Sequence, residues 1–148
     1  MGDLTHVNSK GKAIMVDIGD KLVQNRIARA RGYIKMAPRT IRLITENQLK
    51  KGDVLTVAQL AGINAAKKTG SLIPLCHNIV LENIKVVLTS GKERVTAESE
   101  IGCTGKTGVE MEALTAVSVA LLTVYDMCKA VDKNMVIDSI ELIEKIKK

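Results

Sequence analysis

The hydrophobic pattern changes its period along the chain, and its clearest stretch alternates with a period of two. Residues 26–36 place small or apolar side chains at every second position, from Ala28 to Met36. The positions between them are basic or aromatic: Arg29, Arg31, Tyr33 and Lys35. Such alternation predicts a half-buried β-strand, here with a basic outer face.

A second stretch, residues 109–131, has the pattern of a helix. It contains no helix breaker, and its Ala, Leu, Val and Met residues fall on every side of the helical wheel. This predicts a core helix that is buried all round. The uncharged run between Glu112 and Asp126 is too short for a bilayer, which needs roughly 20 apolar residues. We therefore expect no membrane span.

Shorter segments predict the remaining elements. Two helices are expected at residues 38–47 and 54–68, the second ending at Gly70. Further strands are expected at residues 13–18, 79–88, 94–101 and 135–146. The last of them should carry three apolar side chains on one face: Ile140, Leu142 and Ile146.

From residue 26 the order is strand, helices, strand, strand, helix, strand, which is the βαββαβ pattern of ferredoxin-like folds. The predicted class is α+β, with an antiparallel sheet and helices packed on one face. A chain of 148 residues suits a single domain. Residues 1–12 are polar and contain glycine, so we expect a mobile N-terminal arm.

Composition narrows the class of partner. The net charge is +6 and the pI is about 9.3, which indicates an anionic partner. Proteins that bind nucleic acid usually add aromatic stacking platforms, yet this chain has two Tyr, no Phe and no Trp. These observations favour a small phosphorylated ligand and argue against nucleic acid.

The cysteines indicate a reducing compartment. Cys76, Cys103 and Cys128 are odd in number and lack CxxC spacing, so they are expected to be reduced thiols in a cytoplasmic protein. The polar N-terminus shows no targeting signal. No pair of ligands occurs at metal spacing, so a zinc site is not expected.

Two charged residues near the end of the long helix are candidates for proton transfer. Asp126 and Lys129 are three residues apart, so their side chains lie on one face and can pair. Asp126 is flanked by Tyr125, Met127 and Cys128. We expect it to be partly buried, which favours its protonated form unless Lys129 holds the charge. A desolvated acid beside a lysine can act in general acid–base catalysis.

Other candidates each have two interpretations. Lys51 precedes a helix N-terminus, where it could bind a phosphate or simply be solvated. His77, which follows Cys76 after an apolar run, could line a pocket or be a satisfied core residue. Glu110 and Glu112 lie in the first turn of the long helix, where the helix dipole alone favours carboxylates.

The glycines before the long helix suggest an anion site. Gly105, Lys106 and Thr107 resemble the end of a phosphate-binding P-loop, but position 100 is Glu100 where that motif needs glycine. The segment is therefore not a Walker A motif. We expect instead a nest of backbone N–H groups formed by three glycines: Gly102, Gly105 and Gly108.

Several long motifs resemble one family over nearly the whole chain. They are TGVEMEALTAVSV and YDMCKAVDKNM in the long helix, KGDVLTVAQLAGINAAKKT, LIPLCH, and the LTH and MVD segments at the start. Together they closely resemble the molybdenum cofactor biosynthesis protein C family, the cyclic pyranopterin monophosphate synthases. These lyases convert 3′,8-cyclo-7,8-dihydroguanosine 5′-triphosphate into cyclic pyranopterin monophosphate and release diphosphate. The resemblance implies a ferredoxin-like fold and a hexamer built from dimers, with active sites between subunits.

The resemblance also implies roles for individual residues. In YDMCK it makes Asp126 the catalytic acid/base and Lys129 its partner, and in KGD it makes Lys51 an essential lysine. Substrate binding is implied for six residues of the LCH and VEME motifs: Leu75, Cys76, His77, Glu110, Met111 and Glu112. A triphosphate substrate would also suit the positive charge of Arg26.

Two departures from the family pattern leave single contributions in doubt. The arm reads THVN where THVD is common, which affects Asn8, and the chain stops at Lys148 without a glycine-rich tail. The reaction demands no hydride or radical chemistry. No organic cofactor or protein-bound metal is therefore expected, although Mg²⁺ could arrive with the triphosphate.

Two other classes of protein compete with an enzyme. A module that binds RNA or DNA would fit the basic charge, but the shortage of aromatics and the acids at both ends of the helix oppose it. A purely structural subunit would fit the buried helix, but it leaves Asp126 and Lys129 unexplained.

The spacing of two site residues predicts an oligomer. Glu112 and Asp126 lie on one helix, about 21 Å apart at 1.5 Å per residue, and on nearly the same stripe. One nucleotide-sized pocket would not easily reach both within a chain. We therefore expect a composite site in which Glu112 of one chain approaches Asp126 of another across a two-fold interface.

Overall fold

The computed structural model describes residues 5–148. Its elements follow one another in this order: β1 (Gln24–Lys35), α1 (Pro38–Thr45), α2 (Val54–Lys67), α3 (Thr69–Leu72), β2 (Asn83–Ser90), β3 (Arg94–Gly105), α4 (Glu110–Cys128) and β4 (Val136–Lys147). The predicted strand at residues 26–36, both early helices and the long helix are thereby confirmed within a few residues.

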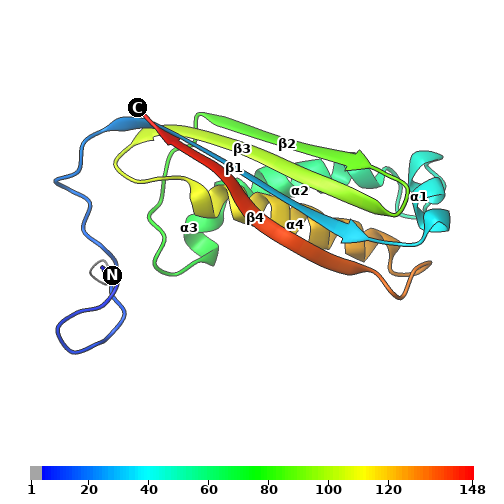
Figure 1. Ribbon diagram of the computed structural model, residues 1–148, viewed down its shortest axis with the longest axis horizontal. Coiled ribbons are helices and arrows are strands. Elements are labelled where there is room, and N and C mark those ends of the chain that lie inside the picture. Colours follow the sequence, from blue (N-terminus) through cyan, green and yellow to red (C-terminus); the bar gives the residue numbers. More distant parts are fainter. Residues whose placement is uncertain (1–4) are drawn as a thin grey trace.

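The four strands form one antiparallel sheet in the order β2-β3-β1-β4. The long helices α2 and α4 lie side by side against one face of this sheet, and α1 lies beyond one end of it (Figure 1). This arrangement confirms the predicted α+β class, with a ferredoxin-like sheet covered by helices on one side. The opposite face carries the predicted basic side chains of β1, and Arg29 there pairs with Glu100 and Glu144.

Small residues bring the two long helices close together. A Cβ added to Gly62 of α2 would lie 3.0 Å from the carbonyl oxygen of Ala116 in α4 and 3.3 Å from Cβ of Ala120. Such contacts are possible only because glycine has no side chain. The packing sets the start of α2 beside the end of α4, where the predicted charged residues of both helices lie.

The pattern had predicted that the long helix is buried all round, and this prediction is wrong. Nine of its 19 residues are buried against the sheet and α2, but Leu122 is 57% exposed and Met111 is 39% exposed. A helix packed on two neighbours keeps one flank open, however apolar that flank is. By length and composition α4 could also cross a membrane, and its burial in the fold accounts for that apolar character.

The predicted strand at residues 13–18 is wrong. This segment forms only an isolated bridge between Val7 and Ala13, because it runs beside no strand with which it could form a ladder. The predicted mobility of residues 1–12 stays a prediction, and residues 1–4 lie outside the described residues. Within the arm, Asn8 closes a turn by accepting hydrogen bonds from the backbone N–H groups of Lys10 and Lys12.

An expectation about a single residue is also wrong. Gly70 does not end the second helix, because α2 ends at Lys67 and Gly70 lies inside the short helix α3. There it leaves room for Asn78, whose Oδ1 would clash with an added Cβ.

The last strand does not carry its three apolar residues on one face. Leu142 pairs with inward-facing Ala30, but Ile146 pairs with Ile27 on the outer face. Register shifts in the pairing of β1 with β4 act as β-bulges, and each extra residue reverses the alternation that follows it.

Candidate active site

The structure gathers the predicted catalytic residues at one end of α4. Nζ of Lys51 lies 2.9 Å from Oδ2 of Asp126, and Nζ of Lys129 lies 3.2 Å from Oδ1 of the same carboxylate. Lysines from two segments therefore bracket one acid. All three side chains are more than half exposed, so the cluster is open to a ligand.

The environment of Asp126 differs from the prediction. We expected a partly buried acid that favours its protonated form, but its side chain faces solvent at the end of α4. The hydrogen bond from Lys51, followed by that from Lys129, lowers the pKa of Asp126 below its ordinary value. Asp126 is therefore ionised at neutral pH and is suited to accept a proton.

A tight turn delivers Lys51 to this cluster. Gly52 adopts a positive φ of 97° and donates its N–H to the carbonyl of Leu49 at 3.0 Å, and Leu49 is buried. Asp53 then caps α2 by accepting hydrogen bonds from the backbone and the hydroxyl of Thr56, as its position in the sequence predicts. The KGD motif thus combines a cation, a left-handed glycine and a helix cap.

The predicted binding residues gather in a pocket of about 330 Å³ at the other end of α4. Six of them line it: Leu75, Cys76, His77, Glu110, Met111 and Glu112. The pocket also includes Thr107 and Gly108 next to the N-terminus of α4, where no side chain caps the helix. Free N–H groups at a helix N-terminus suit an anionic ligand.

Glu112 is the buried acid of this pocket. It is only 4% exposed, and burial raises its pKa above the ordinary value. Neighbouring Glu110 adds to this effect because two like charges disfavour ionisation. At the first turn of α4, desolvation thus outweighs the preference of the helix dipole for carboxylates. This environment favours the protonated form of Glu112 more than an exposed position would.

His77 and Glu110 are fixed by contacts outside their own motifs. Nε2 of His77 lies 2.6 Å from the carbonyl oxygen of Val16. A carbonyl can only accept, so Nε2 carries the hydrogen, and Nδ1 of a neutral ring is left as an acceptor. Glu110 pairs with Nζ of Lys145 on β4 at 3.1 Å.

The segment between the N-terminal arm and β1 contributes residues to the pocket that sequence reasoning missed. Lys21 and Val16 line the pocket beside His6, and Lys106 holds this segment by donating to the carbonyl of Gly19 at 2.7 Å. In the sequence Lys21 is a lone lysine in a polar segment, with no periodicity that marks it. The only signal was the resemblance of the LTH and MVD segments to the family.

Arg26 and the glycine nest do not fit the expected site. Arg26 is buried, donates its Nε to the carbonyl of Gly105 at 3.3 Å, and lines a separate pocket of about 370 Å³. Strand β3 continues to Gly105, so Gly102 and Gly105 pair within the sheet. The predicted nest of three glycines is wrong for these two, and only Gly108 borders the pocket.

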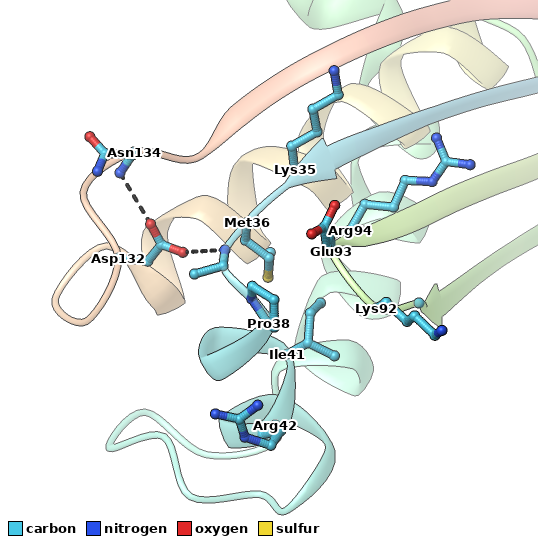
Figure 2. A pocket seen from close by; sticks show the side chains of 12 residues that line it. Lys35, Met36, Pro38, Ile41, Arg42, Lys92, Glu93, Arg94, Asp132 and Asn134 are labelled. Atoms are coloured by element: carbon cyan, nitrogen blue, oxygen red, sulfur yellow. Dashed lines mark hydrogen bonds between the residues drawn. The ribbon is translucent and has the colours of Figure 1, made fainter.

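The two clusters are therefore separated within one chain. Glu112 lies in the first turn of α4 and Asp126 in its last turn, which puts them about 21 Å apart along the axis. Among residues 5–148 no group of three His, Cys, Asp or Glu side chains is placed to hold a metal ion. An open groove of about 1340 Å³ beside α1 (Figure 2) contains none of the predicted site residues.

Comparison with known proteins bears on the family of the chain. The model of the MoaC family matches residues 15–147. Cyclic pyranopterin monophosphate synthase of Chloroflexus aurantiacus is 55% identical over 145 residues, which cover 97% of this chain and 89% of that protein. The protein of the same name from Peptoclostridium acidaminophilum is 53% identical over 143 residues, with 97% and 91% covered.

A longer relative contains the same unit. Molybdenum cofactor biosynthesis protein 1 of Drosophila melanogaster is 54% identical over 144 residues, which cover 96% of this chain but 26% of that protein. The match with the family model and these near-complete alignments agree on one assignment. The chain belongs to the MoaC family.

Proposed function

We propose that this protein is a cyclic pyranopterin monophosphate synthase, a lyase of molybdenum cofactor biosynthesis, with an active site completed by two chains. Its substrate would be 3′,8-cyclo-7,8-dihydroguanosine 5′-triphosphate, and its products cyclic pyranopterin monophosphate and diphosphate. One observation carries the proposal. In a member of this family, the charged cluster and the binding pocket form at opposite ends of α4.

The charges suit phosphate chemistry. Formation of a cyclic monophosphate requires a hydroxyl to attack the first phosphorus while diphosphate leaves, and negative charge develops on the leaving oxygens. Lys51 and Lys129 offer two ammonium groups at the exposed end of α4, where such charge can be stabilised. Mg²⁺ would enter with the triphosphate rather than be held by a ligand set of the protein.

The two acids suit the proton transfers. Ring opening and pterin closure require protons to be removed from some atoms and delivered to others. Burial raises the pKa of Glu112, whereas Lys51 lowers the pKa of Asp126. Groups whose environments drive their pKa values apart divide the roles of acid and base. We assign proton donation to Glu112 and proton acceptance to Asp126.

A second copy of the chain supplies the missing half of each site. A two-fold axis beside α4 would set Glu112 and His77 of one chain opposite the lysine cluster of its partner. The exposed flank of α4, with Leu122 and Met111, offers apolar surface for such contact. Further dimer contacts would build the hexamer implied by the family resemblance, with the phosphorylated substrate held between subunits.

The test of activity is direct. The purified protein is incubated with the cyclised guanosine triphosphate derivative, and diphosphate and the pterin product are measured separately. We expect both products in equal amounts, without added organic cofactor. Diphosphate without pterin would indicate simple hydrolysis and would contradict the proposed reaction.

A further inference from the structure

Lys51 needs support beyond its own ion pair. Both Lys51 and Asp126 are more than half exposed, and ion pairs between exposed side chains are weak because water screens them. The position of Lys51 near Asp126 therefore depends on the segment that carries it. That segment is the turn after α1, with buried Leu49 at its centre.

Helix α1, which leads into this turn, lacks a cap of its own. Its N-cap residue is Ala37, which has no side chain to accept hydrogen bonds, and Pro38 occupies the first turn. The helix has only eight residues and lies at one end of the molecule (Figure 1). A short helix without a cap is marginal unless tertiary contacts hold it.

A carboxylate from a distant part of the chain supplies the cap. Oδ2 of Asp132 accepts the N–H of Ala37 at 2.9 Å and the hydroxyl of Thr40 at 2.7 Å, next to Pro38 and Ile41 at the groove in Figure 2. In a capping box, an acid three residues into the helix accepts the N–H of the N-cap residue. In α1 this position is occupied by Thr40, which is not an acid. Its hydroxyl donates to Asp132, and Asp132 accepts the N–H of Ala37 instead.

Asp132 belongs to the segment that carries the other half of the cluster. It follows Lys129 by three residues, and its Oδ1 accepts the N–H of Asn134 at 3.1 Å, which closes the turn after α4. Arg39 of α1 adds a second link by donating to the carbonyl of Val131 at 2.8 Å. One carboxylate thus joins the end of α4 to the start of α1.

The Asp132 cap is well formed. Asp132 is 8% exposed and Thr40 is fully buried. Burial acts to raise the pKa of Asp132, but the hydrogen bonds from Ala37, Thr40 and Asn134 together lower it. The carboxylate is therefore ionised, and each of its oxygens has a donor.

We propose that Asp132 is a positioning residue for the reaction: by capping α1 it holds the segment that sets Lys51 against Asp126 and Lys129. This inference rests on the proposed function, because it assigns a role within the same site. The Asp132 side chain accepts hydrogen bonds from Ala37, Thr40 and Asn134 rather than from a residue of the charged cluster. It acts through the path from Thr40 along α1 to the turn of Lys51.

Three variants test the role of this cap. Asp132→Asn keeps the shape of the side chain but removes its charge. Thr40→Val removes the hydroxyl in a nearly isosteric way, and Thr40→Ser is the matched control that keeps it. Circular dichroism and native mass spectrometry first establish that each variant is folded and assembled as the parent protein is.

Two readouts are then compared. The first is the rate of reductive methylation of the Lys51 amine, followed by mass spectrometry and referred to exposed Lys67 of α2. The second is kcat with the cyclised triphosphate. We expect Asp132→Asn and Thr40→Val to speed methylation of Lys51 and to lower kcat about tenfold, since small misplacement of a catalytic group is costly. Thr40→Ser should resemble the parent protein in both.

The outcomes separate the cap from the proposed reaction. Unchanged methylation of Lys51 and unchanged kcat, with only a lower melting temperature, would reduce Asp132 to a stabilising cap and overturn the proposal. Faster methylation with unchanged kcat would overturn it too. If the parent protein itself fails to turn over the substrate, the proposed function is wrong, and the methylation rates still report on the cap.

Discussion

Glu112 and Asp126 stand at opposite ends of one helix and in opposite electrostatic environments. Glu112 is buried, and that burial raises its pKa, whereas Asp126 faces solvent between two lysines that lower its pKa. In the proposed function, the acid at the start of the helix donates a proton and the acid at its end accepts one. If both act on one substrate, the distance between them along the helix favours a site completed by a second chain.

The buried acid should reduce stability as pH rises. Because the folded-state pKa of Glu112 is raised, the native state binds its proton more tightly than the unfolded chain, so stability is lost as pH rises above the unfolded value of about 4.3. Glu112→Gln should remove this loss. We expect the variant to melt a few degrees above the parent protein at pH 7.5 and close to it at pH 4.5. If the variant and the parent protein melted at the same temperature as each other at both pH values, this would contradict a raised pKa of Glu112.

Loss of either lysine of the cluster should lower kcat/KM much more than it lowers the stability of the fold. Lys51→Ala and Lys129→Ala should each lower kcat/KM by about 10² or more, the usual scale for loss of a group that acts in the transition state. Lys50→Ala is the matched control, because Lys50 is the exposed neighbour of Lys51. Steady-state kinetics and melting curves check the expectation. A Lys51→Ala enzyme as active as the Lys50→Ala enzyme would remove Lys51 from the site.

Substrate binding should depend on salt. A triphosphate held by ammonium groups on an exposed cluster is screened by ions, with a Debye length of about 8 Å at physiological ionic strength. We expect the dissociation constant of an unreactive triphosphate analogue to rise steadily with sodium chloride in isothermal titration. A monophosphate analogue should bind more weakly and respond less. Identical salt dependence of the two analogues would argue against lysines as the phosphate ligands.

The close packing of α2 on α4 should be sensitive to volume. Gly62→Val would drive a branched side chain into the carbonyl of Ala116 and the side chain of Val86, both 3.0 Å from an added Cβ. Overpacking of this kind costs about 1–3 kcal/mol. Asn64→Val introduces the same side chain at an exposed position of α2 and should cost far less. Thermal denaturation of both variants tests the difference.

The sequence predicted the fold well where local pattern decides the structure. Strict alternation in residues 26–36 marks β1 because inward positions such as Ala28 and Ile34 are buried under the helices. The sequence did not predict the features that depend on which strands pair and in which register. Nothing in the pattern of β4 reveals the register shifts opposite β1 that turn Ile146 outward. Residues 13–18 have strand-like composition, but in the part of the chain that the structure describes they form an isolated bridge and no ladder.

The site was predicted by residue type rather than by environment. Family resemblance selected Asp126, but its apolar neighbours in the sequence pointed to a buried acid, since the pattern cannot show which flank of a helix stays open. The cap of α1 by Asp132 spans 95 residues between Ala37 and Asp132. No local signal could have located it. Lys21 was missed for a similar reason, because the tertiary path of the segment before β1 brings it to the pocket.

The composite site is tested most directly by complementation between two inactive variants. Glu112→Gln and Asp126→Asn chains are dissociated, mixed in equal amounts and reassociated, with exchange confirmed by native mass spectrometry. If each site draws Glu112 from one chain and Asp126 from its partner, random pairing restores about one intact site in four. We therefore predict recovery of roughly a quarter of the parent activity. Complete exchange without any recovery would contradict a site shared between two chains.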